Sequence, residues 1–456
     1  MSSIEEGVAS IKEDQLSKEQ KAAIKLVLEK KKNLFIQGQA GTGKSAFIKY
    51  LQANCDKNIV LCSPTAIAAL NVGGVTLHSL FRLPIMDYIT EDKLFKMNRK
   101  NVWSVIKAID ILIIDEVSMV RPDVLDAVDK VCRKIKHSFK KPFGGIQVIL
   151  IGDLYQLPPV IKSDTADIFK MAYGTTSPYF FDAEAYKTGN FKVIQFTKVF
   201  RQEDDELLKN LIKIRTSNDI KTALSYFNKC KINDKKRLST AVTITPYKAI
   251  AEAINKKRLD KITDVPRKFK AILSGTFETA SESTYPVQKE LVFKPGALVI
   301  FNKNDKDKRW VNGSVGIIKK INTNNIIVEL LATGEEVMVI RDTWENKEYN
   351  TEIETKFNPE TGNIEEKEVI TENITGEFTQ FPLQLGYAIT IHKAQGKTLD
   401  CVNIDLDRGA FAHGQLYVAL SRTRAKEDIN ITGEIKQRDV IFDERVQEFL
   451  KINQSH

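Results

Sequence analysis

Short apolar runs alternate with amphipathic stretches along the first third of the chain. Four of these runs end in glycine or in polar residues, and they occupy residues 33–38, 58–65, 110–116 and 146–153. Continuous apolar runs are typical of parallel strands that helices cover on both faces. The pattern therefore predicts a doubly wound α/β domain in which the carboxyl ends of the strands carry the functional side chains.

A second series of the same kind begins near Val193. Residues 191–202 lead into the stretch 203–215, where leucines recur at helical spacing and acidic residues precede basic ones, as a helix dipole favours. We expect a second α/β domain here. Its further strands are expected at 241–246, 297–302, 386–391 and 401–406.

Residues 310–381 have a different pattern of apolar and polar residues. Short β-prone runs in this segment are separated by turn signals at Asn324-Asn325 and Thr333-Gly334. The segment is therefore expected to form a small β barrel that is inserted into the second α/β domain.

The net positive charge of the chain indicates a polyanionic binding partner. The 456 residues carry a formal net charge of +9, which favours nucleic acid, although a merely lysine-rich surface would give the same balance. The 5 cysteines are scattered without a CxxC pair, which argues against a zinc site or a disulfide framework. Without a bilayer-spanning apolar run or a secretory signal, we expect a cytoplasmic location in association with DNA and no membrane partner.

Residues 38–45, GQAGTGKS, form a phosphate-binding loop, because the segment follows an apolar strand and opens a helix. Its glycines let backbone N–H groups surround phosphates, Lys44 reaches the outer phosphates, and the Ser45 hydroxyl is a ligand for Mg²⁺. The motif indicates a nucleoside triphosphate but selects no single function. The residues assigned to the nucleotide here are Gly38, Gly41, Thr42, Gly43, Lys44 and Ser45.

Polar side chains follow the next strands. Asp115 can hold Mg²⁺ through water while Glu116 orients or deprotonates the attacking water, although two acids can also merely cap a strand. Gln156 follows the strand after that and is expected beside the γ-phosphate. Gln20, just before the first helix, can pair its amide with adenine and so favours ATP, but a glutamine is more often a solvated surface residue.

A second Gly-Lys-Thr, at 396–398, looks like the tail of another phosphate-binding loop. Such a loop needs a glycine five positions before its second glycine, and Ile391 occupies that place inside a β run. The segment is therefore not a second nucleotide site. We expect it to form a wall that faces the first one.

Seven segments together resemble, in order, the motif series of a superfamily 1 helicase. The variants TLHS, DEVSM and HKAQG are most similar to the petite-integration-frequency (PIF) branch of superfamily 1B, near the RecD-like helicases. The resemblance spans nearly the whole chain and implies two RecA-like parallel-sheet cores that share one nucleotide. The segments are 38–45, 62–81, 113–120, 152–160, 199–202, 390–400 and 415–424.

The resemblance also implies a domain layout. An insertion with Phe95, Met97 and Trp103 stands where the family has a strand-separating wedge, although the same residues fit a helix that packs its apolar face. The inserted barrel would be of the Src-homology type. The expected segments are 1–81 and 104–189 for the first core, 82–103 for the wedge, 190–309 and 382–435 for the second core, 310–381 for the barrel, and 436–456 for a C-terminal helix.

Residue roles follow from the resemblance in the same way. Arg201 and Arg422 would enter from the second core and neutralise charge on the transferring γ-phosphate, and the alternative for each is a surface salt bridge. Gln395 and Gly396 would complete the nucleotide wall. The catalytic set that the resemblance implies is Lys44, Glu116, Gln156, Arg201 and Arg422, with Ser45 and Asp115 as the metal ligands.

A further group of residues resembles the positions that line the family's DNA track. Hydroxyl groups and lysine bind phosphates without reading sequence, and His78 can stack on a base. The alternative for His78 is a histidine of the core. The group consists of Pro64, Thr65, Thr76, His78, Thr390, His392 and Lys393.

The resemblance therefore implies an ATP- and Mg²⁺-dependent DNA helicase that moves 5′→3′ on single-stranded DNA and unwinds duplex at single-strand junctions. We expect a monomer when the protein is free. Three alternatives stay open: a translocase that hydrolyses ATP without unwinding, a non-enzymatic single-strand-binding module, and a GTPase. The last is suggested by the guanine-recognition pattern Asn302-Lys303-x-Asp305.

Overall fold

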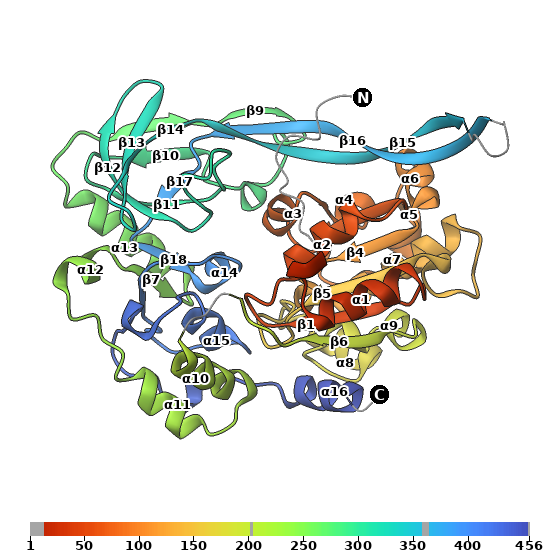
Figure 1. Cartoon of the computed structure of the whole chain (residues 1–456), viewed down its shortest axis with the longest axis horizontal. Coiled ribbons are helices and arrows are strands. Elements are labelled where there is room, and N and C mark those ends of the chain that lie inside the picture. Colours follow the sequence, from red (N-terminus) through yellow and green to blue (C-terminus); the bar gives the residue numbers. More distant parts are fainter. Residues whose placement is uncertain (1–12, 201–203, 358–363, 455–456) are drawn as a thin grey trace.

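The computed structural model describes residues 13–200, 204–357 and 364–454. Two parallel sheets run through it, with helices packed around them, and antiparallel sheets lie beside the second of the two (Figure 1). The α/β class with two RecA-like cores, which the apolar runs and the resemblance predict, is confirmed. Among the helices of the described residues, none is long and apolar enough to cross a membrane.

The first core is a parallel sheet with the strand order β3-β2-β4-β5-β1-β6. Each of the four apolar runs near the start of the chain supplies one of its strands. The last strand corrects an expectation, because β6 pairs in parallel with β1 and so belongs to this core, although we expected the second core to begin at 190. The strands are β1 (Leu34–Gly38), β2 (Ile59–Ser63), β3 (Val75–Thr76), β4 (Ile111–Ile114), β5 (Gln147–Gly152) and β6 (Lys192–Phe196).

Helices cover both faces of this sheet because alternate strand residues point to opposite sides. Ile111 and Ile113 of β4 pack in the cluster that contains α1 and α2 residues, whereas Leu112 and Ile114 pack in the cluster that contains α7. The helices are α1 (Lys18–Leu28), α2 (Lys44–Ala53), α3 (Ala66–Val72), α4 (Leu77–Leu80), α5 (Glu91–Lys96), α6 (Trp103–Ala108), α7 (Pro122–Ile135), α8 (Ala166–Tyr173) and α9 (Glu184–Thr188).

The second core is a smaller parallel sheet with the order β18-β7-β19-β20. The expected strands at 241–246, 386–391 and 401–406 belong to it. Its strands are β7 (Val242–Thr245), β18 (Ala388–Thr390), β19 (Val402–Ile404) and β20 (Ile429–Ile431). The helices of this region are α10 (Asp205–Thr216), α11 (Ile220–Phe227), α12 (Lys235–Thr240), α13 (Lys248–Asp260), α14 (Ile391–Ala394) and α15 (Gln415–Leu420).

The antiparallel sheets do not follow the boundaries 310–381 that we expected for the small β barrel. One sheet, with the order β14-β13-β12-β11-β17, extends beyond that segment at both ends and includes the run at 297–302 that we expected in the second core. Its strands are β11 (Leu298–Phe301), β12 (Val315–Ile321), β13 (Asn325–Leu330), β14 (Glu336–Ile340) and β17 (Leu383–Leu385). Two short strands, β8 (Arg267–Lys270) and β10 (Glu290–Phe293), pair beside it.

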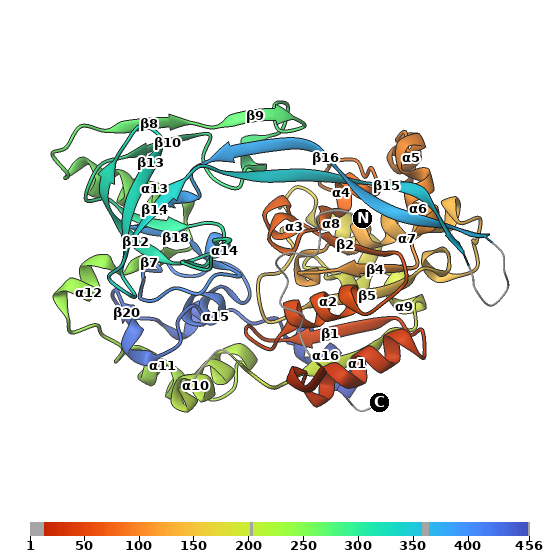
Figure 2. The same ribbon diagram turned by 45° about the horizontal axis from the view of Figure 1, so that its top comes forward.

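The rest of the 310–381 segment forms a long hairpin of β15 (Asp342–Phe357) and β16 (Ile364–Gln380), with β9 (Ile272–Gly275) at the edge of β16. The hairpin crosses above the first core (Figures 1 and 2). The Tyr349 hydroxyl is 3.4 Å from the Leu61 backbone nitrogen, and Arg82 forms a 2.9 Å ion pair with Glu348. This contact could not be predicted from the sequence of the hairpin, because the residues that contact the first core are interspersed with acidic residues.

The last helix, α16 (Glu444–Gln454), returns to the first core and lies near β6 (Figure 1). Its Phe449 ring stacks on Phe181 with a centroid distance of 4.3 Å and also lies 6.1 Å from Phe35 of β1. The C-terminal end of the second core is therefore attached to the first core through aromatic packing.

Candidate active site

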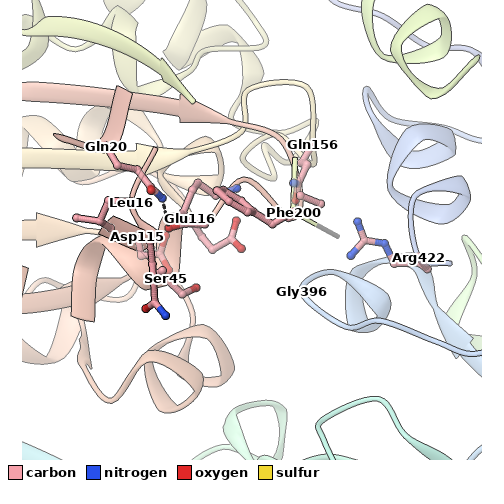
Figure 3. Close-up of a pocket in the computed structure, with 15 residues that line it drawn as sticks. Leu16, Gln20, Ser45, Asp115, Glu116, Gln156, Phe200, Gly396 and Arg422 are labelled. Carbon is pink, nitrogen blue, oxygen red and sulfur yellow. Dashed lines mark hydrogen bonds between the residues drawn. The ribbon is translucent and has the colours of Figure 1, made fainter. Parts of the chain in front are cut away.

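A cavity of about 510 Å³ lies at the carboxyl end of the first sheet. Both cores contribute to it: Figure 3 shows Gly396 and Arg422 on one side, facing Gln156, with Ser45, Asp115 and Glu116 on the other. This volume is typical of a small-molecule site. Its lining is Gln15, Leu16, Gln20, Ala40, Gly41, Gly43, Lys44, Ser45, Ala46, Asp115, Glu116, Gln156, Phe200, Gly396 and Arg422.

The phosphate-binding loop joins β1 to α2, as its sequence predicts. Gly41 and Gly43 have φ angles of +82° and +79°, which glycine adopts without strain. The Lys44 ammonium donates hydrogen bonds to the backbone carbonyls of Gly38 (2.7 Å) and Gln39 (3.0 Å). The amine is therefore held at the mouth of the loop, where the N-terminus of α2 favours an anion.

Two carboxyl groups follow β4 in this cavity. Burial raises the pKa of Asp115, and burial together with the neighbouring Asp115 raises the pKa of Glu116 to about 7, against the opposing effect of Lys44. Glu116 also has a φ of +52°, a left-handed conformation that turns it out of the strand direction. Carboxylate and hydroxyl oxygens are the ligands that Mg²⁺ prefers, so Asp115 and Ser45 form a suitable donor set.

The second core touches this carboxylate pair directly. The Gln395 side-chain amide, which follows α14, donates a 3.0 Å hydrogen bond to the Glu116 carboxylate. Because Gln395 and Glu116 belong to different cores, the bond exists only when the cores are close together. The second Gly-Lys-Thr thus contributes Gly396 to the wall of this cavity.

Gln156 and Arg422 face each other across the cavity (Figure 3). The Gln156 side-chain amide donates to the Asp153 carboxylate at 3.3 Å. The Arg422 guanidinium is almost fully buried and donates to the backbone carbonyls of Val418 (2.7 Å) and Lys397 (3.2 Å). These bonds hold a cation at the edge of the cavity. Arg201, the other expected arginine, lies outside the described residues.

Gln20 lines the cavity, but its amide is engaged within the chain. Its carbonyl accepts a 2.8 Å hydrogen bond from the Ser17 backbone N–H, and its NH₂ group donates to the Gly43 carbonyl at 3.0 Å. Its carbonyl oxygen keeps a second lone pair and its NH₂ group a second hydrogen, so pairing with adenine stays a prediction. In this structure, Gln20 connects the start of α1 to the phosphate-binding loop.

Phe200 is a cavity residue that the sequence reasoning missed. Its ring is about half exposed and lines the cavity, and its backbone N–H donates a 2.9 Å hydrogen bond to the Gly41 carbonyl. An exposed aromatic ring beside a phosphate-binding loop can stack on a planar base. The sequence did offer a signal for it, because Phe200 directly precedes Arg201 in the motif at 199–202. Only the arginine of that motif was assigned a function.

Residues expected on the DNA track gather at the carboxyl ends of strands. Thr65, Thr76 and Thr390 each accept a hydrogen bond from the backbone N–H three residues later, at 3.3, 3.1 and 3.3 Å, and thereby begin α3, α4 and α14. His392 and Lys393 are exposed on α14. The threonine hydroxyls therefore have a structural role as helix caps, and DNA contact by these residues stays a prediction.

The pairing of β2 with β3 brings Pro64 and His78 to the same edge of the first sheet, because Ser63 is in register with Thr76. His78 is partly buried. Burial lowers the pKa of its imidazole, and Arg121 acts in the same direction. A neutral ring at this edge can pack against a base, so both the core and the DNA-facing interpretation of His78 remain consistent with its position.

The expected wedge at 82–103 folds into α5, a short turn and the beginning of α6. The Phe95 ring lies 4.4 Å from the Lys134 ammonium, so this aromatic residue is packed against α7. Met97 and Trp103 keep 37% and 38% of their surface exposed. The segment therefore combines a packed helix face with exposed apolar side chains, and its role in strand separation stays a prediction.

The guanine-recognition pattern at 302–305 lies away from the cavity, since none of its residues is among the lining residues of the described chain. Lys303 donates to the Asp342 carboxylate at 2.9 Å, and Asp305 pairs with Arg309 at 2.7 Å. These side chains are engaged in local contacts of the antiparallel region. The structure therefore gives the GTPase alternative no support.

The turn at 153–156 and the beginning of α15 approach too closely for any residue but glycine at position 414. Gly414 has a φ of +73°, and a Cβ atom there would lie 2.5 Å from the Tyr155 carbonyl oxygen and 2.6 Å from that of Gln156. Contacts this short lie well inside van der Waals separation. The two cores therefore meet backbone to backbone beside Gln156.

Gly414→Ala should weaken this contact. We expect a lower melting temperature and slower nucleotide hydrolysis, because the methyl group forces α15 away from Gln156 at a cost of about 1–3 kcal/mol. The matched control is Gly433→Ala, since Gly433 has a similar φ of +77° but nothing within 4 Å of its Cβ position. Thermal unfolding and turnover that are the same in both variants would contradict this expectation.

The chain is similar to known proteins over almost its entire length. Residues 15–237 match the family model described as "PIF1-like helicase". The chain is 30% identical over 450 residues to the protein named "ATP-dependent DNA helicase Pif1" of Bdellovibrio bacteriovorus, and the match covers 98% of this chain and 94% of that protein.

Solved structures of a Bacteroides Pif1 resemble the fold. The complex with ADP-AlF4 has a TM-score of 0.83 with 34% identity, and the complex with single-stranded DNA has a TM-score of 0.68 with 35% identity. Both comparisons cover 96% of this chain and 97% of the other. Of these two structures, the one named without DNA is thus more similar to the arrangement described here.

Proposed function

We propose a mechanism for this chain, which belongs to the PIF1-like helicase family. It is an ATP-dependent DNA helicase of this family. In our proposal it moves 5′→3′ along single-stranded DNA and separates duplex at single-strand junctions. One ATP-binding cavity between two cores supplies the energy, and alternating closure and opening of the cores supplies the movement.

The observation that carries the proposal is that one cavity draws side chains from both cores. Lys44 and Glu116 come from the first core and Arg422 comes from the second. Hydrolysis then depends on closure, because the charge that develops on the γ-phosphate is fully neutralised only when Arg422 is in place. The bond between Gln395 and Glu116 connects the same closure to the hydrolytic carboxylate.

Each side chain has a defined chemical task in this mechanism. Lys44 binds the outer phosphates, and Glu116 orients the attacking water and accepts its proton. Gln156, which lines the same cavity, would contact the γ-phosphate. Ser45 and Asp115 would hold Mg²⁺, which when bound supplies positive charge next to the phosphates.

DNA would run along the edge formed by the carboxyl strand ends of both cores. Lys393 supplies a cation, and the threonine-capped beginnings of α3, α4 and α14 supply polar groups for phosphates, which suits binding without sequence readout. The net charge of +9 favours such a partner. As the cores close, the distance between Thr65 and Thr390 would change, and this change would move the bound DNA strand relative to the protein.

Strand displacement on tailed duplexes tests the function directly. With ATP and Mg²⁺, we expect displacement from a duplex with a 5′ single-stranded tail and little from one with a 3′ tail, because the polarity sets the strand on which the protein loads. Reactions without ATP are the control. Displacement from the 3′ tail alone would refute the polarity, and DNA-stimulated hydrolysis without any displacement would favour the translocase.

A further inference from the structure

Arg215 is largely buried at the boundary between the two cores, close to the ATP cavity but outside its lining. It lies in the last turn of α10, where the sequence suggested a basic residue that favours the helix dipole. Its side chain is only 15% exposed, and its guanidinium carbon lies 4.2 Å from the ring centroid of Tyr155 and 5.9 Å from that of Tyr417. Such burial of an arginine needs a specific anionic partner.

That partner is Asp153, a fully buried carboxylate directly after β5. Arg215 donates to it at 2.9 Å, and Gln37, which precedes the phosphate-binding loop, donates to the same oxygen at 2.7 Å. Gln156 of the cavity donates to the other carboxylate oxygen at 3.3 Å. Asp153 therefore joins the strand that carries the phosphate-binding loop, the cavity amide and the second core.

The charge of Arg215 keeps this carboxylate ionised. Burial alone would raise the pKa of Asp153, but Arg215 and Lys44 together bring it below its ordinary value. Without Arg215, the Asp153 carboxylate would be buried without this cation beside it. Its pKa would then rise, and the carboxylate would tend to take up a proton. A protonated Asp153 could no longer accept hydrogen bonds from Gln37 and Gln156 equally well.

The same turn also sets the position of α15. The Tyr417 hydroxyl lies 3.5 Å from an Asp153 oxygen, and the His413 ring nitrogen Nε2 lies 3.0 Å from the Leu154 carbonyl oxygen. Arg422 follows α15 by two residues and donates to the Val418 carbonyl of that helix. Docking of α15 on the 153–156 turn therefore fixes where Arg422 stands relative to Gln156.

We propose that Arg215 is a positioning residue for ATP hydrolysis. Through Asp153, it holds the 153–156 turn against α15, so that Gln156 and Arg422 face each other across the cavity at the spacing that the transition state needs. This inference rests on the proposed function of the cavity. Because Arg215 does not line the cavity, it contributes to the chemical step rather than to the binding of ATP.

The central test is Arg215→Met, which keeps an unbranched side chain but removes the charge. We expect DNA-stimulated kcat to fall about ten-fold or more while the KM for ATP stays within about two-fold, since only an arrangement that matters in the transition state is lost. The matched control is Lys213→Met on the same helix, which removes a charge from an accessible ion pair with Asp219. That control should retain the kcat of the unmodified protein.

A double-mutant cycle separates this role from simple packing. If Arg215 acts through the Asp153 charge, Arg215→Met should lower kcat much less in an Asp153→Asn background, where no buried carboxylate needs a cation. An equal loss in both backgrounds would overturn the proposal, because packing against Tyr155 and Tyr417 would then explain the effect. Unchanged kcat in the single variant, with its fold confirmed by thermal unfolding, would overturn it as well.

Arg215→Lys keeps the proposal testable if the methionine variant does not fold. Lysine retains the charge but lacks the planar fork that bonds and stacks at the same time, so we expect an intermediate kcat and an unchanged KM. A lysine variant with a raised KM and full kcat would refute the positioning role. Failure of the proposed function itself is distinguishable, because the unmodified protein would then show no DNA-stimulated ATP hydrolysis.

Discussion

Lys44→Ala should abolish DNA-stimulated ATP hydrolysis and strand displacement while leaving the fold in place. Lys44 is the cation at the mouth of the phosphate-binding loop, where its ammonium bonds the Gly38 and Gln39 carbonyls. Its removal takes away a positive charge that stabilises the negatively charged phosphates in the transition state. We therefore expect turnover to fall by more than about 10³-fold. Steady-state hydrolysis at saturating single-stranded DNA measures the effect.

The control for this variant is Lys49→Ala, because Lys49 lies on the same helix, α2, with an exposed side chain. It changes the net charge by the same amount without touching the cavity. Normal turnover by Lys44→Ala would show that the assigned site is wrong. Loss of turnover in both variants would instead indicate a general effect of charge on the protein or on its binding to DNA.

Arg422→Ala should separate hydrolysis from ATP binding. The guanidinium reaches the cavity from the second core, whereas the phosphate-binding loop belongs to the first. An arginine that neutralises the transferring γ-phosphate contributes about 10³–10⁵-fold in rate, so we expect a loss of that order with ATP affinity nearly unchanged. Single-turnover hydrolysis and equilibrium binding of ATP by calorimetry measure the two quantities independently.

Arg422 also has a structural role, which the experiment must account for. Its bonds to the Val418 and Lys397 carbonyls hold the loop after α14 close to α15. Melting temperature is therefore measured alongside turnover, and Arg424→Ala serves as the control because Arg424 is exposed and lies two residues later. If Arg422→Ala hydrolyses ATP at the rate of the control, its role in catalysis is excluded.

Local sequence accounts for much of the cavity. The phosphate-binding loop and the Asp115-Glu116 pair each depend on a few consecutive residues, and each follows an apolar strand whose carboxyl end must lie at one edge of a parallel sheet. The order of the strands need not be known for this inference. Lys44, Asp115 and Gln156 therefore come together at the predicted place.

Contacts between segments that are distant in the sequence could not be predicted from local sequence. An apolar strand can pair with any neighbour that presents a free edge, so nothing local assigns β6 to the first sheet or brings α16 back to it. The polar hairpin of β15 and β16 carries no continuous apolar run that would reveal its docking on the first core. Its length and position follow from pairing and from a few buried side chains such as Tyr349.

Short segments of the sequence were enough to predict the α/β class and a phosphate-binding loop with its acidic pair, because these depend only on the order of neighbouring residues. The resemblance also implied that Gln395, Gly396 and Arg422 reach the site from the opposite core, whereas the surroundings of Phe200 and Arg215 followed only from the tertiary structure. Phe200 and Arg215 look unremarkable in the chain, since an aromatic residue in a loop and a basic residue at a helix end are common. Their environment arises only when segments far apart in sequence exclude water together, and burial then gives Arg215 its partner in Asp153.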